Sequence, residues 1–152
     1  MVDVVRPATL ADVGALVPRL RQADVDECDA LNGPGQVMKM AVATVAGSPL
    51  ALAWEHDGEL IALFGVAGTM LDSIGTPWLI GTPALHRQGR ALIRLAPSYI
   101  RRMTELFPKL ANVVDVRNTR SIRWLKRLGF RFHPAMPEGV AGLPFHLFTM
   151  GV

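Results

Sequence analysis

The chain has 152 residues, half of them hydrophobic, and a formal net charge of +3. This length suits one domain with a sizeable hydrophobic core, and this composition excludes a disordered protein. No apolar run approaches the roughly 18 residues that a membrane-spanning helix needs, and the N-terminus lacks the basic-then-apolar layout of a signal peptide. We therefore expect a single domain over residues 1–152, without a transmembrane segment.

The charge is unevenly distributed along the chain. Residues 1–86 carry 4 Lys/Arg and 10 Asp/Glu, whereas residues 87–131 carry 12 Lys/Arg and only Glu105 and Asp115 as acids. A basic half can attract nucleic acid, an acidic protein or a phosphorylated cofactor. The alternative interpretation is a pair of solvated helix faces that keep the protein soluble.

The N-terminal third predicts one strand and two helices. Val2–Arg6 alternates like a short strand, and a helix follows with Val13 and Leu16 among its apolar face. Next comes an acidic cluster, which we expect to be a solvated loop, although it could hold a cationic amine. Its members are Asp24, Asp26, Glu27 and Asp29. The Met- and Ala-rich segment Gln36–Ala46 predicts a second helix.

The middle of the chain predicts a hairpin, a strand and a long helix. Leu50–Trp54 and Glu59–Val66 flank an Asp-Gly pair, which is typical of a tight hairpin turn. Trp78–Gly81 is a short apolar strand. A helix follows from about Ala84, and Pro97 within it predicts a kink.

The last third predicts a strand at Asn112–Val116 and then a short helix capped by Asn118 or Thr119. Gly129 is placed to end that helix in the left-handed conformation. The segments Phe130–Phe132 and Phe145–Met150 supply two more strands. The predicted fold class is mixed α/β: a sheet of about seven strands flanked by about four helices.

This order of elements resembles the GNAT (acyl-CoA N-acyltransferase) fold, and local motifs agree. Members of that family carry an Asn after the fifth strand, followed by a short helix that ends in Gly-Phe. Asn118, Ser121 and the pair Gly129–Phe130 match this pattern in the segment NTRSIRWLKRLGFRF. The resemblance implies a central mixed sheet and an acetyl-CoA site.

The family's cofactor loop has the pattern Gln/Arg-x-x-Gly-x-Gly/Ala between a strand and the long helix. Aligned without gaps from Asn118, this pattern falls on His86–Ala91. Free N–H groups at a helix N-terminus can cradle a pyrophosphate. The alternative is that Gly89 only permits close helix packing. The resemblance implies these cofactor-binding residues: Gly81, Thr82, His86, Arg87, Gln88, Gly89, Arg90, Ala91 and Asn118.

The sequence also departs from the family pattern. Many members place a tyrosine, the proton donor to the departing thiolate, at the position occupied here by Leu125. The only tyrosine is Tyr99, which we expect to be an unlikely substitute because it lies well inside the long helix. The catalytic residues are therefore unknown. Glu55, at the end of a hairpin strand, is a weak candidate for the general base, and no metal site is expected.

Within GNAT-like sequences, the chain resembles the acetyltransferase-like and internal virion proteins of T7-like, podovirus-type tailed phages. The segments VVRPATLADVGALVPRLRQAD, LALAWEHDGELIALFGV and WLIGTPAL carry this resemblance together with VVDVRNTRSIRWLKRLGFRF. It implies a bacteriophage structural or assembly protein in the virion or the host cytoplasm, with other virion proteins as partners and weak or absent transferase activity. The alternative is an active acetyl-CoA-dependent N-acetyltransferase that modifies a host protein or a small amine. Nucleic acid is an unlikely partner, because the basic segment lacks interleaved aromatic residues.

Overall fold

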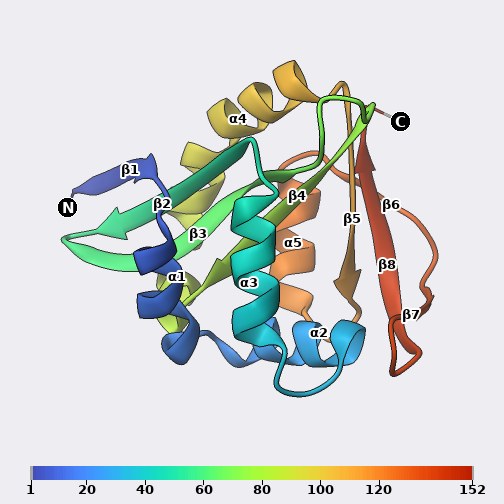
Figure 1. Ribbon diagram of the computed structural model, residues 1–152. Coiled ribbons are helices and arrows are strands. Elements are labelled where there is room, and N and C mark those ends of the chain that lie inside the picture. Colours follow the sequence, from blue (N-terminus) through green and yellow to red (C-terminus); the bar gives the residue numbers. More distant parts are fainter. Residues whose placement is uncertain (1, 152) are drawn as a thin grey trace.

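A computed structural model describes residues 2–151 as one mixed sheet with helices on both faces (Figure 1). The strands are β1 (Asp3–Pro7), β2 (Leu50–His56), β3 (Glu59–Ala67), β4 (Ile74–Gly81), β5 (Lys109–Asp115), β6 (Arg131–Phe132), β7 (Met136–Glu138) and β8 (Leu143–Met150). The α-helices are α1 (Leu10–Leu16), α2 (Gln22–Asn32), α3 (Val37–Ala46), α4 (Gly89–Leu106) and α5 (Thr119–Arg127).

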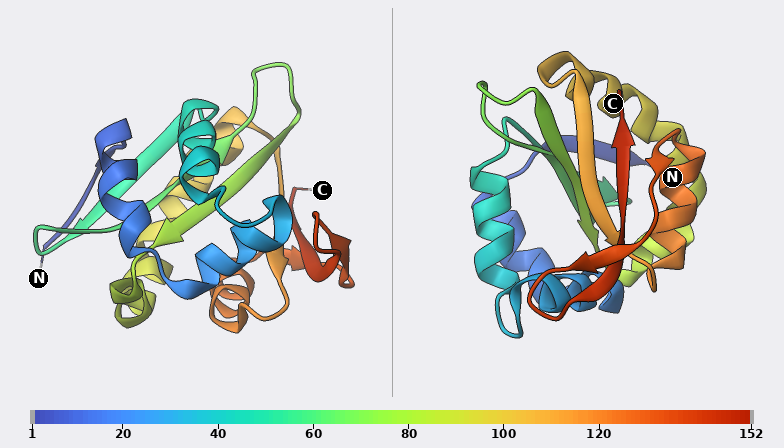
Figure 2. Two further views of the ribbon diagram at one scale, coloured as in Figure 1. Left: turned by 60° about the horizontal axis from the view of Figure 1, so that its bottom comes forward. Right: turned by 90° about the vertical axis from the view of Figure 1, so that its right-hand side faces the viewer.

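The sheet order is β1-β2-β3-β4-β5-β8-β6, and β7 pairs with β8 beside this path. Every pairing is antiparallel except that of β4 with β5. Helices α1, α2 and α3 cover one face, and α4 and α5 cover the other; the right-hand view of Figure 2 shows the strands between the two layers. The fold is therefore a three-layer α/β arrangement, as the element order predicted.

Three local predictions are confirmed. The two-residue turn Asp57–Gly58 joins β2 and β3, and both residues have positive φ, as a tight hairpin turn requires. The side chain of Asn118 accepts a hydrogen bond from the N–H of Ser121 and so caps α5. Gly129 has a φ of 97°, the left-handed conformation that stops this helix.

Other predictions need correction. The acidic cluster that we expected in a loop lies within helix α2, which brings the described α-helices to five. Strand β7 was not predicted and brings the described strands to eight. Strand β4 begins at Ile74, before the predicted Trp78, because its first residues are paired with β3 and β5. The long helix does not start at Ala84. A 3₁₀ segment, Pro83–Gln88, comes first and α4 begins at Gly89 and continues through Pro97.

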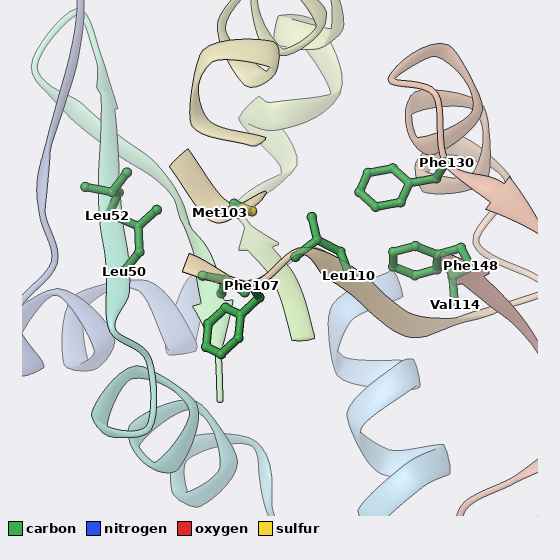
Figure 3. Packing of buried hydrophobic residues seen from close by; sticks show 9 residues of the cluster. Leu50, Leu52, Met103, Phe107, Leu110, Val114, Phe130 and Phe148 are labelled. Carbon is green, nitrogen blue, oxygen red and sulfur yellow. The ribbon is translucent and has the colours of Figure 1, made fainter. Parts of the chain in front are cut away.

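The hydrophobic core on the α4/α5 side is built around aromatic rings (Figure 3). Phe107, which is fully buried, lies beside Leu50 and Leu52 of β2, and Leu110 lies between this group and Phe148. Phe130 meets Phe148 edge to face, with ring centroids 5.2 Å apart. A smaller buried group that includes Val13 and Leu16 fixes α1 on the opposite face. No helix within residues 2–151 is both long and apolar enough to cross a membrane.

The two parallel strands at the centre of the sheet separate along their length. β4 pairs with β5 only at Ile74–Lys109 and Gly75–Leu110. From there the strands diverge toward their C-terminal ends, as Figure 1 shows. The sheet is thus open in its middle, and α2 and α5 lie on either side of the opening.

Candidate functional site

The opening between β4 and β5 exposes backbone groups that a neighbouring strand would normally bind. Gly81 faces it with both peptide groups: its N–H donates to Asp24 Oδ2 at 2.9 Å, and its C=O accepts from the N–H of Arg21 at 2.9 Å. On the opposite strand, the N–H of Asp115 donates to Glu27 Oε1 at 3.1 Å. Asn112 reaches across and donates from Nδ2 to the C=O of Pro77 at 2.7 Å. Three side chains and the backbone N–H of Arg21 therefore bind peptide groups that strand pairing leaves free along this opening.

The peptide groups of Leu79, unlike those of Gly81, have no hydrogen-bond partner along the opening within residues 2–151. In an antiparallel ladder, alternate residues turn their peptide groups to the same edge. Thr82 donates to Ile61 of β3, so the groups of Leu79, like those of Gly81, face the opening. No partner meets them within the described residues 2–151. An extended ligand that contains amides could bind this edge as an added strand does.

A cavity of about 540 Å³ occupies the opening and passes through the sheet. This volume lies in the range of small-molecule sites. On the α4/α5 side its walls include Phe64, Leu92, Ala96, Tyr99, Val114 and Leu125. On the α2/α3 side they include Cys28, Leu31, Val37, Met40, Ala41 and Trp78. A molecule entering from one face can therefore meet a molecule entering from the other.

A buried ion pair closes one end of this cavity. Arg21 and Asp24 are 2% and 6% exposed, and the guanidinium binds the carboxylate through Nε at 2.8 Å and Nη2 at 3.0 Å. Nη2 also donates to Ser121 Oγ at 3.0 Å, and the guanidinium lies 5.2 Å from the Trp124 ring centroid. The pair thus fastens α2 to the end of β4 and to α5. Buried Nη1 has no hydrogen-bond partner among the described residues.

Glu27 lies one turn further along α2, on the cavity wall. Its Oε1 accepts the N–H of Asp115 and also Nδ2 of Asn118, the latter at 2.9 Å. Burial raises the pKa of Glu27 to about 7, and these two hydrogen bonds oppose the rise only in part. A carboxyl group with a pKa near neutrality can take up and release a proton under physiological conditions.

Six of the nine predicted cofactor residues form one continuous strip, His86–Ala91, at the junction of the 3₁₀ segment and α4. His86–Gln88 lie in the 3₁₀ segment, and Gly89–Ala91 form the first turn of α4. Of the nine predicted residues only Asn118 lies on the cavity wall itself. A side chain at Gly89 would place its Cβ 3.2 Å from Trp124 Nε1, so this glycine does allow close packing between α4 and α5. Whether the strip binds a cofactor stays a prediction.

Charge gathers on the same side of the sheet as this strip. Burial, followed by the nearby Arg120, lowers the pKa of His86, which favours its neutral form. The positive charge of the layer instead comes from exposed arginine and lysine side chains. They are Arg90, Arg94, Arg101 and Arg102 on α4, and Arg120, Arg123, Lys126 and Arg127 on α5. A polyanionic ligand is therefore favoured at the α4/α5 layer.

The structure places the two catalytic alternatives differently from what the sequence suggested. Glu55 lies on β2, where its carboxylate pairs with Arg6 Nε at 3.0 Å, and it is not among the residues of the cavity wall. Tyr99 does lie on that wall, as does Leu125, and its ring meets Phe64 edge to face. Its position inside the long helix therefore does not remove it from the site.

Sequence reasoning missed the two residues that dominate the cavity electrostatically. Glu27 was one of four acids in a segment interpreted as a loop, and Arg21 was not singled out. One signal was present in the sequence: on a helix, Arg21, Asp24 and Cys28 share one face with Glu27 beside them. The partners of these residues, Gly81, Asn118 and Ser121, are distant along the chain, so no local pattern reveals them.

Comparison with solved structures identifies the fold. An Ard1 protein from Thermoplasma volcanium superposes with a TM-score of 0.72 at 10% identity, covering 99% of this chain and 97% of that one. The chain has the GNAT acetyltransferase fold. A phosphinothricin acetyltransferase from Sinorhizobium meliloti, solved in complex with AcCoA, gives a TM-score of 0.69 at 17% identity, covering 99% and 88%.

The ribosomal-protein-S18-alanine N-acetyltransferase from Escherichia coli gives a TM-score of 0.64 at 16% identity, covering 98% of this chain and 93% of that one. No protein-family model and no curated protein sequence matches this chain. The likeness is therefore one of GNAT architecture across almost the whole chain, at identities that carry no residue-level correspondence.

Proposed function

We propose that this protein binds an acyl-CoA thioester in the opening between β4 and β5 and transfers its acyl group to an amine. The observation that carries the proposal is the cavity that crosses the sheet where the two strands part. Acyl transfer between two bound molecules needs a site that both can reach from different sides. A continuous sheet would offer no such passage.

The residues around the opening suit such a donor. The free peptide edge at Leu79 suits the amide groups of a pantetheine arm. The exposed arginines of α4 and α5 suit its phosphates, which they can bind through charge-assisted hydrogen bonds. When bound, the thioester supplies an electrophilic carbonyl carbon and a thiolate leaving group. The protein's own contribution is to hold donor and acceptor together, which can account for a large part of a rate enhancement.

A second candidate is a virion-associated structural or assembly protein of a bacteriophage, with degenerate transfer machinery and other virion proteins as partners. Two observations support the degenerate transfer machinery in this candidate. Leu125, which cannot donate a proton, is part of the cavity wall. In addition, both peptide groups of Gly81 are already bound, the C=O by the N–H of Arg21 and the N–H by Asp24 of α2, so that part of the edge is closed to a ligand.

Calorimetric titration with acetyl-CoA separates the two candidates. We expect binding in the micromolar range, and at least tenfold weaker binding for Ala96→Phe, whose ring would fill the α4/α5 side of the cavity. Ala46→Phe is the matched control, because Ala46 is exposed at the end of α3. Absence of binding at millimolar acetyl-CoA would overturn the transferase proposal and leave the structural one.

A further inference from the structure

The α2/α3 half of the cavity differs from the half under α4 in carrying carboxylates. Its walls are mainly apolar, with Cys28, Leu31 and Met40 among them. Two carboxylates, Asp24 and Glu27, also lie on the cavity wall. Asp24 is fully engaged with Arg21 and Gly81. Glu27 is therefore the carboxylate of this wall that remains available to a ligand.

The hydrogen bonds of Glu27 fix its orientation. Both donors, the N–H of Asp115 and Nδ2 of Asn118, bind the same oxygen, Oε1. The other oxygen, Oε2, has no hydrogen-bond partner within residues 2–151, and it is not among the fully enclosed unpaired atoms. Asp115 of β5 and Asn118, the N-cap of α5, thus hold the carboxylate through Oε1. Because Glu27 lines the cavity, Oε2 is the oxygen left for a ligand there.

Burial is the main cause of the raised pKa of Glu27, and the charged groups around it make smaller contributions of both signs. Asp24, one turn away on α2, disfavours its negative charge, whereas Arg21 favours it. From the β5 side, the Asp115 carboxylate is bound by Arg117 Nη2 and Nε, so the two charges largely cancel. An ammonium group in the α2/α3 half of the cavity could therefore bind Glu27 Oε2, which has no hydrogen-bond partner within residues 2–151.

We propose that Glu27 is the general base of an acceptor subsite that takes a primary amine carried on an apolar group. The proposal rests on the proposed acyl transfer. The Glu27 carboxylate accepts one proton from the bound ammonium and frees the nitrogen lone pair. That pair forms the C–N bond to the thioester carbonyl as the C–S bond breaks with its electrons on sulfur. The second nitrogen proton neutralises the thiolate through solvent, and Glu27 returns its proton to water.

This arrangement needs no acid at Leu125. A thiol has a pKa of about 8.5, so the thiolate is a good leaving group near neutral pH. The difficult proton transfer is the one from the ammonium, whose pKa is about 10 in a lysine-like amine. A base with a pKa near 7 in a water-poor cavity is suited to that transfer.

The first test measures amine binding without any donor. We expect 2-phenylethylammonium to shift backbone amide NMR signals of α2 and α3 at pH 8, and to bind at least tenfold more tightly than ethanolammonium, which has the same charge. Glu27→Gln should weaken the binding at least tenfold, whereas Glu105→Gln, at an exposed site on α4, should not. Binding unaffected by Glu27→Gln, or equal binding of the two amines, would overturn the subsite.

The second test measures acyl transfer from acetyl-CoA to 2-phenylethylamine. In the wild type, log(kcat/KM) should rise with unit slope below about pH 7 as Glu27 ionises. Glu27→Gln should lower kcat at least tenfold and remove that limb, yet bind acetyl-CoA as the wild type does. An unchanged profile, or no transfer by a wild type that binds both molecules, would overturn the assignment. Failure of acetyl-CoA to bind the wild type would instead overturn the proposed function and leave the amine-binding result standing.

Discussion

The two edges of β4 face different partners. Toward β3, all six residues from Thr76 to Gly81 are in register with a neighbouring strand. Toward β5, only Ile74 and Gly75 are paired with a strand. Beyond them, the side chains of Asn112 and Asp24 bind Pro77 C=O and the N–H of Gly81, and the backbone N–H of Arg21 binds Gly81 C=O. A ladder is repetitive and closed to ligands, whereas individual side chains can satisfy the same groups and leave room between them. The difference explains how one strand supports both the core and the cavity.

The largest expected loss of stability comes from breaking the Arg21–Asp24 ion pair, which binds the β5-facing edge of β4 at Gly81. Asp24→Ala removes the partner of Arg21, a charge that is 2% exposed, and of the N–H of Gly81. An unpaired buried charge typically costs about 3–5 kcal/mol, and we expect a loss of this size in the free energy of unfolding from urea denaturation. Asp26→Asn, on the same helix, is the control and should cost less than about 0.5 kcal/mol. Equal losses would show that the open edge does not depend on the pair.

A second test uses the pH dependence of stability. Because the folded protein raises the pKa of Glu27 from 4.5 to about 7, the folded state binds this proton more tightly than the unfolded state does. The stabilisation is full below pH 4.5 and is lost as the pH rises through 7. Allowing for partial exposure, the loss should be on the order of 1–3 kcal/mol. Glu27→Gln should remove this fall, and Glu105→Gln should retain it. A wild type whose stability is unchanged between pH 5 and 8 would contradict the shift.

A third test concerns the bridge across the opening. Asn112 donates to Pro77 C=O, and its Oδ1 accepts the N–H of Val113 at 2.7 Å. Asn112→Ala removes the side-chain partner of Pro77 C=O and of the Val113 N–H. We expect this loss to lower the free energy of unfolding by about 1–2 kcal/mol. Hydrogen exchange should speed up at Val113 but not at strand-paired Leu63 of β3. Equal acceleration at both amides would mean that the bridge supports the whole sheet rather than the opening.

The smallest expected effect is that of Tyr99→Phe. The Tyr99 hydroxyl has no hydrogen-bond partner among the described residues, so stability should change by less than about 0.5 kcal/mol. Transfer should fall by less than threefold if the thiolate leaves unassisted. A tenfold fall in kcat with unchanged acetyl-CoA binding would instead assign to Tyr99 the proton-donor role that Leu125 cannot fill.

Local sequence determined the elements whose formation depends on neighbouring residues. The Asp57–Gly58 turn, the Asn118 cap and the Gly129 stop follow from backbone preferences within a few positions. The order of strands and helices predicted the mixed α/β class, and that order together with the motif from Asn118 to Phe130 carried the resemblance to the GNAT fold. By contrast, the acidic segment 24–29 has weak helical periodicity, so its helix forms where tertiary contacts hold it, and the sequence suggested a loop.

Only the tertiary structure decided which side chains meet. Glu27 acquires its raised pKa from burial against Asp115 and Asn118, about 90 residues away along the chain. The opening between β4 and β5 likewise depends on where α2 and α5 pack, which no spacing within either strand encodes. The physical reason is that desolvation and long-range hydrogen bonding belong to pairs of distant residues, whereas turns, caps and helix stops belong to the chain's immediate neighbours.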